Sequence, residues 1–181
     1  MTWTRRTMML AAGAAAILPC PAGAQPPSFN GKRRPWTIVE PPTPAPAAIF
    51  TNEKNGILNF RRYRGRVLLV NFWATWCPAC LHELPDLDRL QARLVPEGMN
   101  VMPINLDTDS RLARPYYERL GIRHLPLYLD PHGNTATAFG LREGLPWNFL
   151  IDRESMIQGY LMGAANWTDP DGIRLLRHYL G

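Results

Sequence analysis

Two cysteines, Cys77 and Cys80, stand between a continuous apolar run at 67–72 and a helical pattern that begins at Pro78. This order constrains the fold most, because it predicts a buried strand whose end delivers two thiols to the first turn of a helix. Backbone N–H groups and the positive dipole end at a helix start favour a thiolate. We expect Cys77, nearer solvent, to attack and Cys80 to resolve the mixed disulfide. By itself the pair also fits half of a zinc site or a structural bridge.

The start of the chain is typical of an export signal rather than of a folded element. Arg5 and Arg6 give a charged beginning, 8–18 is apolar, and the small residues at 22–24 match a cleavage site. The apolar stretch is shorter than the roughly 20 residues that span a bilayer. The adjacent arginines suit a twin-arginine leader as well as general secretion. We therefore predict a cleaved signal peptide at 1–24 and a periplasmic protein.

Cysteine usage indicates chemistry rather than scaffolding. Cleavage after residue 24 removes Cys20, and Pro19 before it is a poor match to a lipidation site, so a membrane tether is the weaker interpretation. The mature chain then keeps Cys77 and Cys80 alone, which excludes a disulfide framework. An exported protein with a single close pair uses it for chemistry more often than as a staple.

The charge balance argues against nucleic acid as a partner. Removing Arg5 and Arg6 from a net charge of +5 leaves +3. The densest basic patches lie at 32–34 and 61–64. We interpret them as solvated surface; the alternative is a weak steering patch for an acidic partner or the membrane surface.

The remaining pattern predicts a short extension and one folded domain. Residues 25–48 are rich in proline and lack periodicity, so we expect an extended tether or strap, with 36–39 as its one candidate edge strand. A domain at 49–181 is predicted to open with a hairpin that ends at 57–60. Its further strands are predicted at 67–72, 99–106, 125–129, 147–152 and 156–162, and its helices at 78–95, 111–120, 134–139 and 169–180. This alternation predicts an α/β sandwich with a mixed sheet.

At this point the motif residues match a known family. The stretch 70–80, Val-Asn-Phe-Trp-Ala-Thr-Trp-Cys-Pro-Ala-Cys, with Glu83 and Pro85 after it, resembles the exported TlpA/ResA-type branch of the thioredoxin superfamily. The later Gly-Leu-Pro at 144–146, followed by the strand at 149–152, resembles the cis-proline loop of that family. The resemblance extends from the start of the predicted domain to the end of the chain.

The resemblance implies a thioredoxin-like three-layer α/β/α sandwich with a mixed central sheet, an N-terminal β-hairpin and a βα insertion at 99–121. It implies a reductase that takes electrons from a membrane donor of the thiol-reductase type and passes them to oxidised periplasmic proteins. Family substrates include the haem-binding cysteines of apocytochrome c, in cytochrome c biogenesis, and copper-site assembly factors. No metal and no cofactor beyond the redox-active Cys77–Cys80 disulfide is implied, and we expect a monomer.

The resemblance also implies roles for single residues. Pro146 is expected to be cis, with the backbone of Leu145 beside Cys77, where a substrate segment pairs as an added strand. Glu83 is expected to be a partly buried carboxylate of raised pKa that moves the proton during exchange. Asn71 stands where cytosolic thioredoxins carry a buried acid. The expected substrate contacts are Trp76, Pro78, Ala79, Leu145, Pro146 and Trp147.

Two departures from the family pattern leave the partner open. Trp147 and Asn148 replace the small hydroxyl residues usual after the proline, and 142–144 is one residue longer than common forms. We expect both differences to line the substrate groove. Trp73 fits either a flank of the cysteine pair or the core.

Other functions remain as alternatives. A copper-binding assembly factor needs two cysteines and a distant histidine, and of His82, His124, His132 and His178 only His124 suits a third ligand. A dithiol oxidase has the same cysteine pair, and the reduction potential alone distinguishes it from a reductase. A peroxidase is disfavoured because no separate peroxidatic cysteine remains, and a non-enzymatic binding module leaves the pair and Glu83 without purpose.

Overall fold

Strand β4 lies inside an eight-stranded mixed sheet and is buried along its whole length. The computed structural model describes residues 25–142 and 144–181, so the predicted leader and Glu143 lie outside it. The strands are β1 (Thr37–Pro44), β2 (Ile49–Asn52), β3 (Ile57–Asn59), β4 (Val67–Trp73), β5 (Met99–Asn105), β6 (Tyr128–Leu129), β7 (Trp147–Ile151) and β8 (Met156–Met162). The helices are α1 (Pro78–Leu94), α2 (Ala113–Arg119), α3 (Asn134–Ala138) and α4 (Pro170–Leu180), with 3-10 turns η1 (Phe60–Tyr63) and η2 (Ser110–Leu112).

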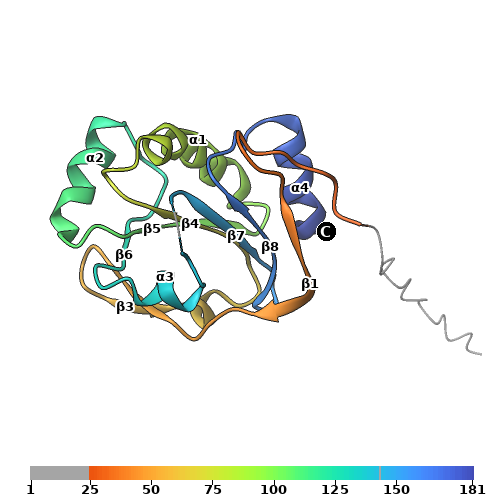
Figure 1. Ribbon diagram of the computed structural model, residues 1–181, viewed down its shortest axis with the longest axis horizontal. Coiled ribbons are helices and arrows are strands. Elements are labelled where there is room, and N and C mark those ends of the chain that lie inside the picture. The colour runs from red at the N-terminus through yellow and green to blue at the C-terminus, as the bar shows by residue number, and fades with distance from the viewer. Residues whose placement is uncertain (1–24, 143) are drawn as a thin grey trace, which may run out of the picture.

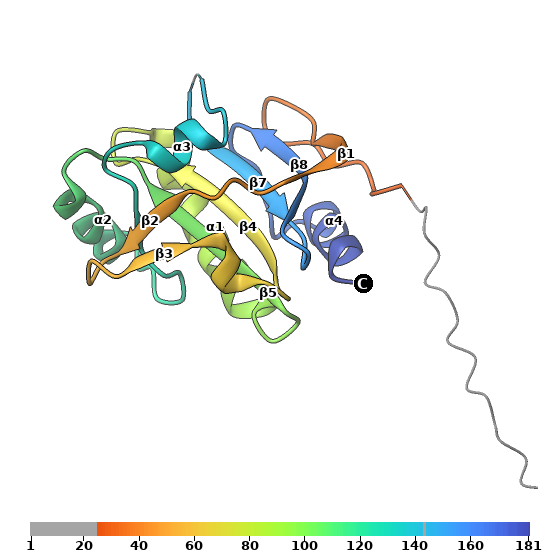
Figure 2. The same ribbon diagram turned by 90° about the horizontal axis from the view of Figure 1, so that it is seen from below.

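The sheet runs in the order β1-β8-β7-β4-β5-β6-β2-β3. β4 pairs parallel with β5 and antiparallel with β7, which makes the sheet mixed as predicted. Figures 1 and 2 show α1, α2 and α4 on one face of the sheet and α3 on the other. The thioredoxin-like α/β/α sandwich with its added β2–β3 hairpin is therefore confirmed.

Alternate residues of β4 supply the two cores. Val67, Leu69 and Trp73 pack with the leucines of α1 and with α4, while Leu68 and Phe72 pack with the aromatic residues around α3. Side chains on a strand alternate between faces, so a strand covered on both sides is apolar throughout. Asn71 is the one polar residue of β4.

The proline-rich segment joins the sheet instead of standing apart from it. β1 pairs antiparallel with β8 at the sheet edge, so the predicted edge strand is longer than expected and begins one residue later. Prolines suit an edge because they have no N–H to donate to a further strand. The sheet therefore includes residues on the N-terminal side of Ile49.

Two predicted elements differ in length. The strand predicted at 125–129 is formed only at Tyr128–Leu129: the Leu125 N–H donates to Asp88, and Pro126 has no N–H and accepts the Tyr117 hydroxyl on its carbonyl. The helix predicted at 111–120 begins as η2, capped by Asp109, and becomes α2 at Ala113. Among the described residues, none of the helices is long and apolar enough to cross a membrane.

Candidate active site

The cysteine pair occupies the start of α1. Cys77 is the N-cap residue and Cys80 lies in the first turn, and the two form a disulfide with Cα atoms 5.3 Å apart. The Cys80 N–H points at Cys77 Sγ across 3.2 Å. Cys77 is 5% exposed and Cys80 1%, which matches the expected order of outer and inner cysteine. A helix-start N–H aimed at Cys77 Sγ favours its thiolate once the pair is reduced.

The residues around the pair divide between surface and core. Pro78 and Ala79 are exposed, and Trp76 is exposed to 66%, so all three are available to a partner. Trp73 is fully buried and stacks on Tyr117 with ring centroids 5.6 Å apart. Trp73 therefore belongs to the core.

Asp107 anchors the loop that enters the cysteine pair, a role that the sequence did not reveal. Its carboxylate accepts the backbone N–H of Thr75 at 3.0 Å and the Thr75 hydroxyl at 2.9 Å. The Asn105 side chain donates to the same carboxylate at 2.7 Å. Because Trp73 and Asn105 are register partners of parallel strands, an acid two residues further on comes to lie opposite Thr75.

The Leu145–Pro146 bond is cis, as predicted. Phe72 of β4 pairs with Trp147 of β7, so the loop before Cys77 and the loop that holds Pro146 leave the sheet at the same end. The Gly163 N–H donates to the carbonyl of Pro146 at 2.8 Å. Leu145 is half-buried and its backbone is placed at the cysteine end of the molecule.

Glu83 lies one turn after Cys80 and is buried beneath the site. Its Oε2 accepts from Asn71 Nδ2 at 3.0 Å, and its Oε1 accepts from the Ala165 N–H at 2.9 Å, Trp167 Nε1 at 2.8 Å and Asn148 Nδ2 at 3.3 Å. Asn71 Nδ2 also donates to Asn148 Oδ1 at 2.9 Å. These five residues, named here the Glu83 cluster, come from α1, β4, β7 and the segment before α4.

Burial raises the pKa of Glu83 to about 7, although its four N–H donors act in the opposite direction. Desolvation penalises the charged carboxylate, whereas N–H donors stabilise it, and here burial is the larger effect. A group with a pKa near 7 exchanges its proton readily at neutral pH. Asn71 Oδ1 is buried without a partner among the described residues, while Asn71 Nδ2 donates to both Glu83 and Asn148.

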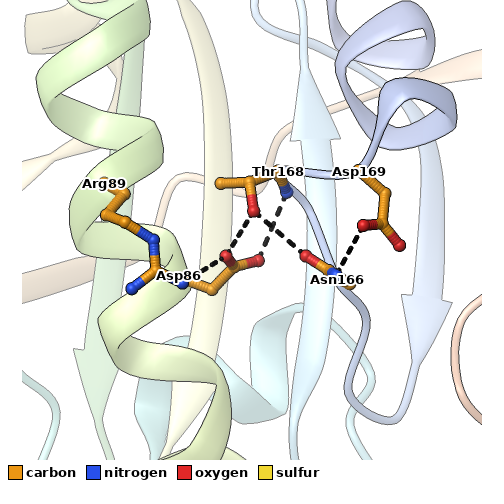
Figure 3. A network of polar contacts seen from close by, with 5 residues as sticks. All are labelled: Asp86, Arg89, Asn166, Thr168 and Asp169. Atoms are coloured by element: carbon orange, nitrogen blue, oxygen red, sulfur yellow. Dashed lines mark hydrogen bonds and ion pairs between the residues drawn. The ribbon is translucent and has the colours of Figure 1, made fainter.

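A second carboxylate of α1 holds the segment that reaches Glu83. Figure 3 shows Asp86 between Arg89 and Thr168, with Asn166 and Asp169 beside them. Asp86 accepts the Thr168 hydroxyl at 2.5 Å and the Thr168 N–H at 3.2 Å, and pairs with Arg89 at 2.9 Å. Residues 165–168 are thus attached to α1 at two consecutive turns.

Asn148 and Trp167 are functional residues that the sequence misplaced or missed. Asn148 was expected to line a substrate groove, but it is fully buried in the Glu83 cluster, because it follows Trp147 on β7 and faces α1. Trp147 is half-buried and does line a surface pocket with Leu145 and Pro146. Only the polarity of Asn148 inside an apolar strand hinted at its role, and nothing local singles out Trp167.

The histidines do not gather into a metal site. Within 25–142 and 144–181, no group of three histidine, cysteine or acidic residues is arranged to hold a metal ion. His124 is exposed, and its backbone N–H donates to Asp88 at 2.7 Å. No observation of the described residues favours the copper-binding alternative.

Comparisons with known proteins agree with this geometry. Residues 41–160 match the AhpC/TSA family. The chain is 26% identical to the thiol-disulfide oxidoreductase ResA of Geobacillus kaustophilus over 74% of this chain and 75% of that protein. It is 31% identical to the thiol:disulfide interchange protein DsbE of Pseudomonas aeruginosa over 57% of this chain and 54% of that one. The solved structure of a thiol:disulfide interchange protein of the thioredoxin family from Chlorobium tepidum is similar, with a TM-score of 0.66 and 28% identity. The match covers 77% of this chain and 97% of that one.

Proposed function

We propose that this chain, which belongs to the AhpC/TSA family, reduces disulfides in periplasmic proteins. It is a ResA/TlpA-like thiol-disulfide oxidoreductase of the thioredoxin superfamily. One observation carries the proposal: the cysteine pair caps α1, and the next turn of the same helix brings Glu83, with a pKa of about 7, beneath it. A structural disulfide has no use for such a proton carrier. Redox work at neutral pH does.

The proposed reaction is two successive thiol–disulfide exchanges. The Cys77 thiolate attacks one sulfur of the partner's disulfide, that S–S bond breaks, and the partner's second sulfur leaves as a thiolate. The Cys80 thiolate then attacks Cys77 Sγ, which forms the Cys77–Cys80 disulfide and releases the partner's first sulfur. Two electrons pass to the partner, and the two protons lost by the cysteines complete its thiols.

Glu83 is proposed to serve the second exchange. Cys80 is almost inaccessible to water, so its thiol needs an internal base before it can attack. Glu83 follows Cys80 by three residues on α1, and residues at this spacing share one face of a helix. An ionised Glu83 accepts the Cys80 proton, and Asn71 and Asn148 keep its carboxylate oriented meanwhile.

The cellular setting is part of the proposal. The predicted leader at 1–24 supports export by a cleaved signal peptide. A reductase in an oxidising compartment has to be recharged, so we infer a membrane electron donor of the thiol-reductase type. The proposed partners are oxidised proteins of cytochrome c maturation or copper-site assembly, acted on by a monomer that carries no cofactor beyond its own disulfide.

The test is the reduction of a protein disulfide by the pre-reduced chain. We expect the wild type to reduce insulin and Cys77→Ser to lose the activity entirely. A reduction potential near that of thioredoxin, about −270 mV, supports a reductase, and one near −120 mV supports an oxidase instead.

Trapping identifies the partners. A Cys80→Ser variant keeps the attacking thiol but cannot resolve the mixed disulfide, so partners stay covalently bound. Cytochrome c precursors among the trapped species assign the protein to maturation, and copper-site proteins assign it to oxidase assembly. Proteins of neither kind contradict the proposed substrate classes.

A further inference from the structure

Two arginines far from the cysteines in sequence share a surface pocket with the cis-proline loop. Arg33 and Arg34 line this pocket together with Leu145, Pro146, Trp147 and Met162. The arginines lie outside the segment 41–160 that matches the family.

The arginines sit on a small hairpin that is closed by two internal backbone hydrogen bonds and attached to the sheet by a third. Residues 29–36, named here the N-terminal hairpin, close through the Trp36 N–H, which donates to the carbonyl of Phe29 at 2.7 Å. At the tip, the Gly31 N–H donates to the carbonyl of Arg34 at 2.9 Å. The Lys32 N–H donates to the carbonyl of Ala164 at 2.9 Å, which ties the tip to the end of β8.

Packing also holds the N-terminal hairpin in one position. The rings of Phe29 and Trp36 lie against Trp167, with centroids 5.0 and 6.3 Å apart. Trp36 rests directly on Gly159, where an added Cβ would stand 2.4 Å from its ring. The hairpin thus covers the tryptophan that donates to Glu83 and presents its basic tip at a defined place.

That place is the cysteine end of the sheet. Met162 and Trp147 are register partners at the ends of β8 and β7, and Trp147 in turn pairs with Phe72 of β4. Cys77 follows β4 from the same end. A partner segment that lies along the cis-proline loop therefore passes the arginines.

The tip carries positive charge on an apolar floor. Lys32, Arg33 and Arg34 are exposed, and none of them forms an ion pair with any described residue. Among the residues that the structure describes, the Arg34 side chain has one polar contact, to the sulfur of Met162 at 3.6 Å. Guanidinium groups bind carboxylates through paired N–H donors, and an opposite charge speeds the encounter of two proteins.

We propose that the N-terminal hairpin selects oxidised partner proteins that carry aspartate or glutamate beside the reactive disulfide. The segment lies extended on the cis-proline loop with its apolar side chains on Trp147, while its carboxylates reach Arg33 and Arg34. The proposal rests on the proposed function, because it concerns the partner of the same reaction. A membrane surface is disfavoured as the occupant, since the basic tip adjoins a pocket of the cysteine end rather than a broad basic face.

The test compares two synthetic peptides of equal length, each with one internal disulfide. One carries two aspartates next to a cysteine and the other two asparagines. We expect the reduced wild type to reduce the acidic peptide about tenfold faster at low salt, measured by stopped-flow tryptophan fluorescence. The ratio of the two rate constants falls to one or below in the Arg33→Glu/Arg34→Glu variant, because like charges repel, and to about one at high salt. Since the ratio is taken within each protein, a general loss of activity cancels.

A matched control has the same change of charge at another place. Arg61 and Arg64 are exposed and line a pocket with Met156, at the opposite end of β8 from Met162. Arg61→Glu/Arg64→Glu is expected to keep the ratio. The proposal is overturned if the ratio falls equally in this control, or if the wild-type ratio is near one. Binding of the basic tip to phosphatidylglycerol vesicles, with a peptide ratio of one, would assign the tip to a membrane surface instead. Hydroxyethyl disulfide, which is small and uncharged, distinguishes a failure of this proposal from a failure of the proposed function. If the wild type fails to reduce it, the proposed function itself is wrong.

Discussion

Glu83 and Asp88 are two buried carboxylates on α1 that accept hydrogen bonds from different kinds of donor. Asp88 accepts three backbone N–H groups, from 123, 124 and 125, through a single oxygen at 3.1, 2.7 and 2.8 Å. Glu83 accepts one backbone N–H and three side-chain donors that come from distant parts of the fold. Neither carboxylate forms an ion pair with the described residues.

Helix α1 therefore carries one carboxylate that holds a loop in place and another that is suited to proton transfer. The donors of Asp88 are neighbours in the chain, so its carboxylate shapes a single loop. The donors of Glu83 are mostly side chains from distant parts of the fold, and burial raises its pKa to about 7, so it can lose and regain a proton. The following predictions test whether this division holds.

The largest effect is expected at Asp88. Asp88→Ala leaves three backbone N–H groups without their acceptor, one of them on the buried Leu125, and hydrogen bonds to charged groups are worth about 1.5–3 kcal/mol each. We expect the free energy of unfolding to fall by about 4 kcal/mol in urea titrations, since such losses are not fully additive. Asp88→Asn keeps one acceptor oxygen and should lose less. Equal losses in both variants would mean that packing, not hydrogen bonding, holds this loop.

Glu83 should make stability depend on pH in a defined direction. Its pKa is 4.5 in the unfolded chain and about 7 in the fold, so the folded state binds the extra proton between these values. The contribution of Glu83 to stability is therefore complete below pH 4.5, declines as the pH rises and is lost above 7, by about 3 kcal/mol in total. The difference in unfolding free energy between wild type and Glu83→Gln isolates this decline. Glu118→Gln, at an exposed position of α2, is the control for the same substitution away from the site.

The same group should set the pH profile of the chemistry. We expect the rate of mixed-disulfide resolution by Cys80 to show an inflection near pH 7, and Glu83→Gln to remove the inflection and slow the step roughly 100-fold. Quenched-flow measurements on a preformed mixed disulfide give the rate. Asp88→Asn serves as the comparison and should keep the inflection. A profile that is unchanged in Glu83→Gln would assign the proton transfer to water.

Local patterns made much of this site predictable from the sequence. The cysteine pair at a strand-to-helix junction is a local motif, and the alternation of apolar segments predicted an α/β sandwich with a mixed sheet. The cis Pro146 was expected from the resemblance to the thioredoxin superfamily. The partners of Glu83 were not predictable, because Asn148 and Trp167 lie 65 and 84 residues away and meet it only through the tertiary fold. The strand predicted at 125–129 was too long, because Leu125 and Pro126 form hydrogen bonds to side chains of other elements, Asp88 and Tyr117.

The smallest effect is expected at Thr168, which holds residues 165–168 on α1. Its substitution tests whether the placement of that segment influences the pKa of Glu83. Thr168→Val keeps the volume and the backbone N–H but removes the hydroxyl that donates to Asp86, so we expect a loss of about 1 kcal/mol in unfolding free energy. Because the Ala165 and Trp167 bonds lower the pKa of Glu83, a looser segment should move the inflection of the resolution rate above its wild-type pH.

Arg89→Ala is the matched control for Thr168→Val, since it removes the other partner of Asp86. The Arg89 side chain is 66% exposed, and an exposed ion pair contributes at most about 1 kcal/mol and often much less. We expect almost no change in unfolding free energy and an unmoved inflection. If Arg89→Ala moves the inflection as far as Thr168→Val does, the charge around Asp86 acts on Glu83 directly. The structural carboxylates of α1, Asp86 and Asp88, would then not be independent of the proton-transferring Glu83.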